Sequence, residues 1–282
     1  RDEIRRGGVF FFVPKIPELG TNESWQTAEA KQFTHHEQQI IGVIGDLRIR
    51  FPLIIDGSKI EEELEWNNAI IINDGPWTFS HDLYPKGQRE EYVEVKNIIA
   101  AGSINYPDEF STLPEKLLND VSFPSYMENA EYVPDQQLTG EFAAIFSDQA
   151  VELQLEAGET KYATFDLHMP IHGYPAFEIG TENSGIAISF GYGELNISLY
   201  DGSHHVDADT GWIKTEGVVG KYYGDRYITS DNGVQTVEIP EERTARYMTV
   251  HITAPTNASI KIKKLGIVKS QYPVDWRGKF DA

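Results

Sequence analysis

Short apolar runs separated by Gly, Pro, Asn and Asp recur along the chain, and this pattern predicts β-strands joined by turns. The alternation is clearest in residues 150–159. There Val151, Leu153 and Leu155 are apolar, while the residues between them are polar. Successive side chains of a strand point to opposite faces, so this strand has one apolar and one polar face. Such strands are typical of antiparallel sheets that pack face to face as sandwiches.

Strand patterns of this kind cover most of the chain, whereas helical periodicity is confined to residues 24–39 and 113–120. Strands without intervening helices argue against a Rossmann fold and an α/β barrel. We therefore predict an all-β fold of two antiparallel, jelly-roll-like β-sandwich domains in tandem, with little helix. The predicted strands lie at residues 40–51, 52–57, 68–74, 89–99, 150–159, 161–169, 234–239, 245–254 and 260–270. Residues 185–202 are predicted to hold two strands around a turn, with GYGE at 191–194 as a turn between strands.

The boundary between the two predicted domains lies in residues 111–140, which contain three prolines and no clear strand pattern. We predict an N-terminal sandwich over residues 1–120, a connector over 121–140 and a second sandwich over 141–270. Residues 271–282 follow the last predicted strand as an extended, proline-containing stretch. We expect this stretch to begin a link to a further domain.

Charge narrows the possible partners of the chain. Acidic residues outnumber basic ones by 44 to 24, which gives a net charge of −20. Such a surface repels a phosphate backbone and an anionic membrane, whereas neutral sugars and cations remain possible ligands. No apolar run reaches the roughly 20 residues that a membrane helix needs, so we expect no membrane insertion. The chain has no cysteine, which excludes disulfides and thiolate chemistry.

The acidic loop at residues 201–209 is the densest cluster of possible metal ligands. Asp201, Asp207 and Asp209 offer the hard oxygen atoms that Ca²⁺ prefers, while His204 and His205 suit a transition metal instead. The loop lacks the glycine and the closing glutamate of an EF-hand. A solvated hairpin loop without metal is the alternative interpretation.

Aromatic residues near predicted strand ends could stack on sugar rings. The candidates for carbohydrate binding are Trp212, Trp77, Tyr222 and Tyr223. The alternative is that each of them fills a core or an interdomain contact. The sequence contains no GxSxG, P-loop or HExxH motif. Acidic residues are so abundant that no catalytic carboxylate pair can be singled out, and we predict no catalytic residue and no required cofactor.

Four segments, in this order, resemble the β-sandwich that precedes the catalytic domain of bacterial α-L-rhamnosidases of glycoside hydrolase family 78. They are FDLHMPIHGYPAFEIG at 165–180, ISFGYGEL at 188–195, residues 225–252 with their ARYMTVHI strand, and YPVDWRGKFDA at 272–282. In the first half, IIINDGPWTFSHD at 70–82 is similar to a segment of the family's additional N-terminal sandwich, with Asp74 and Trp77 matching.

The resemblance implies a non-catalytic role for this chain. In the family, two carboxylates in an (α/α)₆ barrel act as general acid and base and invert the anomeric carbon, and no part of this sequence resembles that barrel. The implied partners are the catalytic domain or a rhamnose-containing glycan, in the bacterial periplasm or outside the cell. Some members bind rhamnose with Ca²⁺ through an accessory sandwich, but no residue here matches that site. A free-standing carbohydrate-binding module and an assembly protein without sugar affinity remain alternatives.

Overall fold

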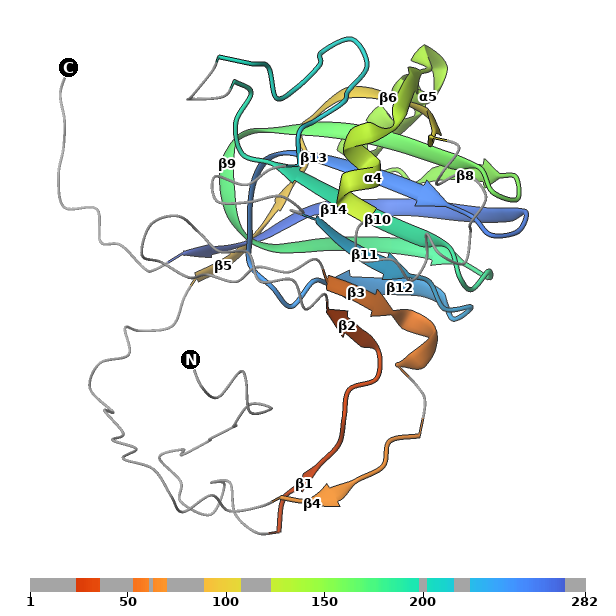
Figure 1. Cartoon of the computed structure of the whole chain (residues 1–282), viewed down its shortest axis with the longest axis vertical. Coiled ribbons are helices and arrows are strands. Elements are labelled where there is room, and N and C mark those ends of the chain that lie inside the picture. Colours follow the sequence, from red (N-terminus) through yellow and green to blue (C-terminus); the bar gives the residue numbers. More distant parts are fainter. Residues whose placement is uncertain are drawn as a thin grey trace, which may run out of the picture. The chain divides into compact units, whose positions relative to one another are not determined.

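The computed structural model describes residues 24–35, 53–60, 63–69, 89–107, 123–197, 202–215 and 224–271. The chain divides into two compact units (Figure 1). One comprises residues 1–31 and 61–83, and the other comprises residues 32–60 and 84–282. In the first unit, β1 (Gln26–Thr27) pairs antiparallel with β4 (Asn67–Asn68).

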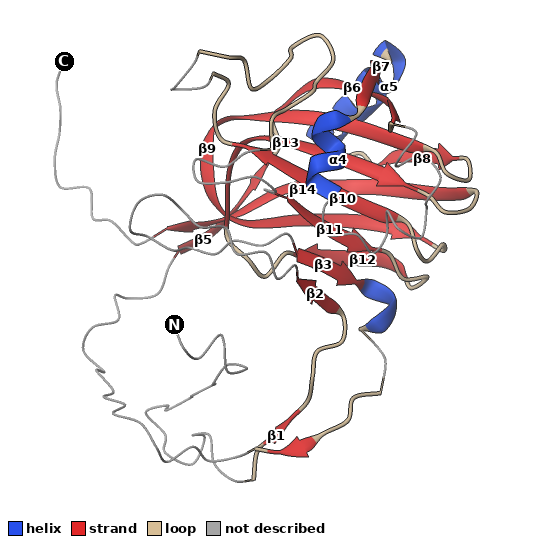
Figure 2. Ribbon diagram, viewed as in Figure 1, coloured by secondary structure: helices blue, strands red, loops and turns tan. Residues whose placement is uncertain are grey.

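The second unit is built on a 12-stranded sheet with few helices (Figure 2). Its strands are β2 (Phe33–His35), β3 (Leu53–Asp56), β5 (Arg89–Glu94), β6 (Asn97–Asn105), β7 (Glu131–Pro134), β8 (Val151–Leu155), β9 (Thr160–Thr181), β10 (Ala187–Gly193), β11 (Gly224–Ile228), β12 (Gly233–Glu238), β13 (Arg243–Thr253) and β14 (Ala258–Gln271). Its described helices are α4 (Phe123–Asn129), α5 (Gln136–Phe142) and the 3₁₀ turns η2 (Gly57–Lys59) and η3 (Ala143–Ser147).

The strands form two layers that share β9. The first layer runs β2-β3-β11-β10-β13-β9 and continues through β6 to β7. The second layer pairs the later part of β9 with β12 and β14, and β14 pairs in turn with β5 and β8. Between its two parts β9 bends at His168, whose φ angle is 67°. The sequence analysis predicted antiparallel sheets, but β3 pairs with β11 in a parallel direction, so the sheet is mixed.

A single large apolar core fills the space between the layers. In β8 the burial alternates residue by residue, which confirms the predicted amphipathic pattern. Phe177 in the second layer contacts Phe190 in the first, with ring centroids 4.9 Å apart. Phe142 at the end of α5 packs edge-on against Phe165 at 6.2 Å. The structure is therefore mostly β and sandwich-like, as predicted from the sequence.

A buried ion pair ties β3 into the first layer. The guanidinium of Arg243 donates two hydrogen bonds to Asp225, at 2.8 Å to Oδ2 and 2.6 Å to Oδ1, and both side chains are almost fully buried. Asp225 Oδ1 also accepts the backbone N–H of Leu53 at 3.1 Å. Because a buried carboxylate needs compensating partners, this arrangement fixes the end of β3 next to β11.

Several local predictions are confirmed and others are wrong. Strands predicted at 52–57, 150–159, 161–169, 234–239, 245–254 and 260–270 are present, with shifted ends. The single strand predicted at 89–99 is instead two strands, β5 and β6, which pair with β14 and with β9. The helix predicted at 24–39 is wrong, because residues 26–27 and 33–35 are strands. The turn predicted at GYGE, residues 191–194, is wrong, because its first three residues belong to β10. The strand predicted at 40–51 and the helix at 113–120 lie outside the described residues.

The division into two separately folding domains, joined by a connector at residues 121–140, remains a prediction. In the structure, strands from both sides of that segment share one sheet, because β5 pairs with β14 and β6 pairs with β9. The segment itself contributes α4, β7 and the start of α5 to the same unit.

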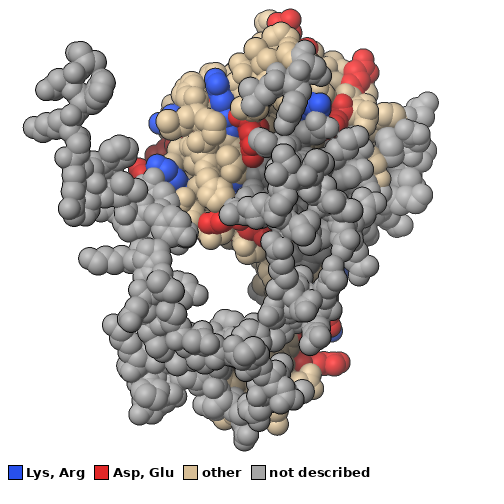
Figure 3. All heavy atoms as spheres, turned by 60° about the vertical axis from the view of Figure 1, so that its left-hand side comes forward, with Lys and Arg blue, Asp and Glu red and all other residues tan. Residues whose placement is uncertain are grey.

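On the face shown in Figure 3, acidic and basic side chains of the described residues lie interspersed.

Candidate functional site

Trp212 is the one predicted sugar-stacking residue that the structure describes; Trp77, Tyr222 and Tyr223 lie outside the described residues. Its indole is half-buried and packs against a small apolar cluster that includes Tyr132 and Tyr162. The indole Nε1–H donates to the backbone oxygen of Glu128 in α4 at 2.8 Å. Trp212 thus joins its loop to α4, and its stacking on sugar remains a prediction.

Asp207 and Asp209 lie in a hairpin loop, while Asp201 lies outside the described residues. Asp207 Oδ1 accepts the backbone N–H groups of Thr210 at 3.0 Å and of Asp209 at 2.9 Å. These hydrogen bonds, that of Thr210 most, lower the pKa of Asp207 and hold the turn. Within the described ranges, no three Asp, Glu or His side chains are placed so that they could hold a metal ion together, and the Ca²⁺ site remains a prediction.

One face of the first layer is polar although it is buried. Cross-strand partners in an antiparallel sheet share a face. In the register, Ser189 lies opposite both Arg226 and His251, and His251 lies opposite Tyr162. The further members of this polar sheet face are Thr160, Thr164, Thr249 and Thr253. Each of these eight residues is at most 7% exposed.

His251 at the centre of the polar sheet face is held between two tyrosines. Its Nε2 lies 2.8 Å from the hydroxyl of Tyr132, and its Nδ1 lies 3.0 Å from the hydroxyl of Tyr106. The Tyr132 hydroxyl donates its proton to the backbone oxygen of Met127, so it accepts from His251 Nε2–H. The Tyr106 hydroxyl then donates to Nδ1. Burial, and next the charge of Arg226, lower the pKa of His251 to about 3, which keeps the ring neutral.

A loop of the chain itself covers the same face. The hydroxyl of Tyr162 donates to Thr210 O at 2.5 Å, and Thr164 Oγ1 donates to Gly211 O at 2.6 Å. Gly211 has a φ angle of 74°, and a Cβ there would lie 3.1 Å from the Cβ of Ala100. Together with Trp212, these contacts close the polar sheet face, so that a ligand could reach it only if the loop moved.

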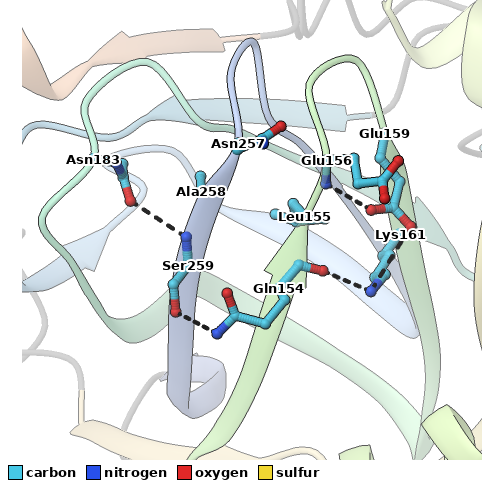
Figure 4. A pocket seen from close by; sticks show the side chains of 9 residues that line it. All are labelled: Gln154, Leu155, Glu156, Glu159, Lys161, Asn183, Asn257, Ala258 and Ser259. Carbon is cyan, nitrogen blue, oxygen red and sulfur yellow. Dashed lines mark hydrogen bonds and ion pairs between the residues drawn. The ribbon is translucent and has the colours of Figure 1, made fainter.

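An open pocket lies where three turns meet: residues 156–159 between β8 and β9, residues 182–186 between β9 and β10, and residues 254–257 between β13 and β14. Figure 4 shows the side chains that line it, which come from several strands and turns. Its volume is about 580 Å³, within the range of about 300–1,000 Å³ that is usual for ligand pockets. The lining residues are Gln154, Leu155, Glu156, Glu159, Lys161, Asn183, Asn257, Ala258 and Ser259.

Hydrogen bonds within this turn pocket use only part of its polar groups. Asn257 Oδ1 accepts the backbone N–H of Ala157 at 2.9 Å, and Asn183 Oδ1 accepts that of Ser259 at 3.3 Å (Figure 4). Each amide oxygen therefore braces a neighbouring segment. The NH₂ groups of these two asparagines have no hydrogen-bond acceptor among the described residues. They remain available as donors to a ligand.

Lys161 and Glu159 form one wall of the turn pocket. Lys161 Nζ donates to Gln154 O at 2.7 Å and lies 3.7 Å from Glu159 Oε1. Glu159 Oε2 also accepts the backbone N–H of Glu156 at 2.9 Å. The same two side chains line a second hollow of about 650 Å³, which extends over β6, β7 and the start of α5. The two hollows are therefore neighbours on the surface.

No family model and no curated protein matches this chain. Solved structures with some likeness include a family 78 rhamnosidase of Bacillus sp. GL1, at 23% identity over 46% of this chain and 12% of that chain, with a TM-score of 0.34. An α-L-rhamnosidase of Dictyoglumus thermophilum is 15% identical over 76% of this chain and 18% of its own, with a TM-score of 0.39.

The CBM32 module of AlyQ, solved with 4,5-unsaturated mannuronic acid, is 16% identical over 61% of this chain and 96% of its own, with a TM-score of 0.25. The chain thus spans less than a fifth of the two rhamnosidases named above. Because all three TM-scores are below 0.5, we draw no functional conclusion from them. Within the described residues, no helix is long and apolar enough to span a bilayer.

Proposed function

We propose that this chain is a non-catalytic accessory region of an α-L-rhamnosidase-like glycoside hydrolase of family 78. The observation that supports this proposal is the sequence resemblance over residues 165–282, read together with the fold. The first three of its four segments correspond to β9, to β10, and to β11 through β13. β10, β11, β13 and the first part of β9 are neighbours in the first layer, and β12 pairs with the later part of β9 in the second layer. The resembling segments therefore make up a contiguous structural unit.

In this proposal the chain packs on a catalytic barrel, shapes the rim of its substrate pocket and contacts carbohydrate. Rhamnose-containing glycans and the catalytic domain are the proposed partners. The net charge of −20 is compatible with a neutral glycan and unfavourable for nucleic acid. We further propose a bacterial protein that acts in the periplasm or outside the cell.

Hydrolysis assays test this proposal directly. The purified chain should release no phenol from an aryl α-L-rhamnoside, because the catalytic general acid and general base are proposed to lie in another domain. The longer natural protein that contains these residues should hydrolyse the same compound. Turnover by the chain itself would contradict the proposal, as would a natural gene that encodes no helical barrel beside these residues.

A free-standing carbohydrate-binding module is the second candidate function. It is favoured by the open turn pocket, which residues of this chain line (Figure 4). The same gene sequence distinguishes the two candidates. A reading frame that encodes sandwich modules without a barrel would favour the second, provided that the chain binds sugar.

A further inference from the structure

We propose that the turn pocket binds one unit of a neutral glycan through its hydroxyl groups, and that the neighbouring hollow takes the next unit. This inference deepens the proposed function by giving the carbohydrate contact a location and a ligand class. Its test measures binding to the chain itself and does not depend on hydrolysis.

The pocket places donors and acceptors close together. The donors are the NH₂ groups of Asn183 and Asn257 and the ammonium of Lys161, which has three N–H bonds and uses one on Gln154 O. The acceptors are the carboxylates of Glu156 and Glu159. A sugar hydroxyl both donates and accepts a hydrogen bond, so neighbouring hydroxyls can use both kinds of group at once.

The charges of the pocket select against an anionic ligand. Lys161 is paired with Glu159, and this leaves the charge of Glu156 without a basic partner in the lining. The neighbouring hollow adds the carboxylates of Asp135 and Glu141 and no further basic residue. A uronic acid would therefore meet like charge, whereas a neutral sugar would not.

The described residues that line the pocket include no aromatic ring, so hydrogen bonds must supply the affinity and orientation. We therefore expect weak binding, with a Kd of about 1 mM for a single sugar. The second hollow shares the Glu159–Lys161 wall with the first, so a disaccharide can contact both. It should bind about tenfold more tightly than its monosaccharide.

The test uses the whole chain with three probes: L-rhamnose, a neutral rhamnose disaccharide and digalacturonate. Titrations are followed by calorimetry and by the NMR signals of the asparagine side-chain NH₂ groups. Asn183→Asp and Asn257→Asp keep the oxygen that braces the neighbouring turn and remove the donor. Each should weaken binding about threefold to tenfold, the usual range for one hydrogen bond.

The matched control is Asn97→Asp, which adds the same charge at an exposed position at the far end of β6. There Asn97 pairs with Asp166, whereas Ser103 at the other end pairs with Lys161. The control should bind the disaccharide as the unmodified chain does. Amide spectra of all variants establish that the fold is retained.

The inference is supported if the neutral disaccharide binds, shifts the NH₂ signals of Asn183 and Asn257, and is weakened by those two variants alone. It is overturned if no neutral probe binds, or if both variants bind the disaccharide as tightly as the unmodified chain does. It is also overturned if digalacturonate binds as tightly as the neutral disaccharide, or if the disaccharide binds no more tightly than L-rhamnose. If the chain binds no sugar while the longer natural protein hydrolyses rhamnosides, the inference fails and the proposed function stands.

Discussion

Mild acid should destabilise this fold through His251. The ring is fully buried between Tyr106 and Tyr132 and stays neutral in the folded protein because its pKa is lowered to about 3. In the unfolded chain the pKa returns to about 6.5. Above pH 6.5 both states are neutral and the stability is complete. Between pH 6.5 and pH 3 only the unfolded state takes up the proton, so stability is lost as the pH falls.

The size of the effect follows from the difference between the two pKa values. Each pH unit in this window changes the free energy of unfolding by about 1.4 kcal/mol. Between pH 7 and pH 4.5 the loss from His251 should therefore be about 2.5 kcal/mol, a large part of the usual stability of a domain. Carboxylates whose pKa is lowered in the fold, such as Asp207 and Glu242, add a loss of the same sign at lower pH.

The variant His251→Gln isolates the contribution of the ring. A glutamine amide keeps one donor toward Tyr132 and one acceptor toward Tyr106, but it does not titrate. Urea unfolding at pH 7, 6, 5 and 4.5, followed by circular dichroism, gives the free energy of unfolding for both proteins. From pH 7 to pH 4.5 the unmodified protein should lose about 2.5 kcal/mol more of its free energy of unfolding than the variant does. A difference that is independent of pH would refute this reasoning.

Four further substitutions should each change stability in urea unfolding. Arg243→Met leaves the carboxylate of Asp225 buried without its partner and should cost about 3–5 kcal/mol, whereas Arg246→Met, at a half-exposed ion pair, should cost less than about 1 kcal/mol; equal losses would contradict this. Asp135→Ala removes the N-cap of α5 and should cost about 1 kcal/mol, while an unchanged midpoint would show that the cap contributes nothing. Gly211→Ala introduces a Cβ at positive φ and should cost about 1–2 kcal/mol; full stability would show that the covering loop adapts.

The alternation of side chains predicted the strands well but could not show what covers each face. In β13 the sequence alternates polar Thr249, His251 and Thr253 with apolar residues, a pattern that normally means one face in water. The structure buries both faces, because a loop and two tyrosines far away in sequence supply hydrogen-bond partners to the polar one. Only the tertiary arrangement creates this environment.

The turn pocket could not be predicted from the sequence, for a related reason. Asn183 and Asn257 lie in different turns, 74 positions apart in the sequence, and neither sits in a recognisable motif. They come together because β9 and β14 pair along their length, which places the adjoining turns at one end of the sandwich. The sequence instead drew attention to aromatic residues, since a tryptophan beside polar residues is a common sign of sugar binding.

The shared strand β9 constrains how this protein can come apart. Its residues 160–166 carry the ladders to β13 and β6, its residues 171–173 extend the ladder to β13, and its residues 173–181 carry the ladders to β14 and β12. Separating either layer would therefore break backbone hydrogen bonds of the same strand that holds the other layer. Amide protons on both arms should exchange with deuterium at one common, slow rate, as members of a single cooperative folding unit.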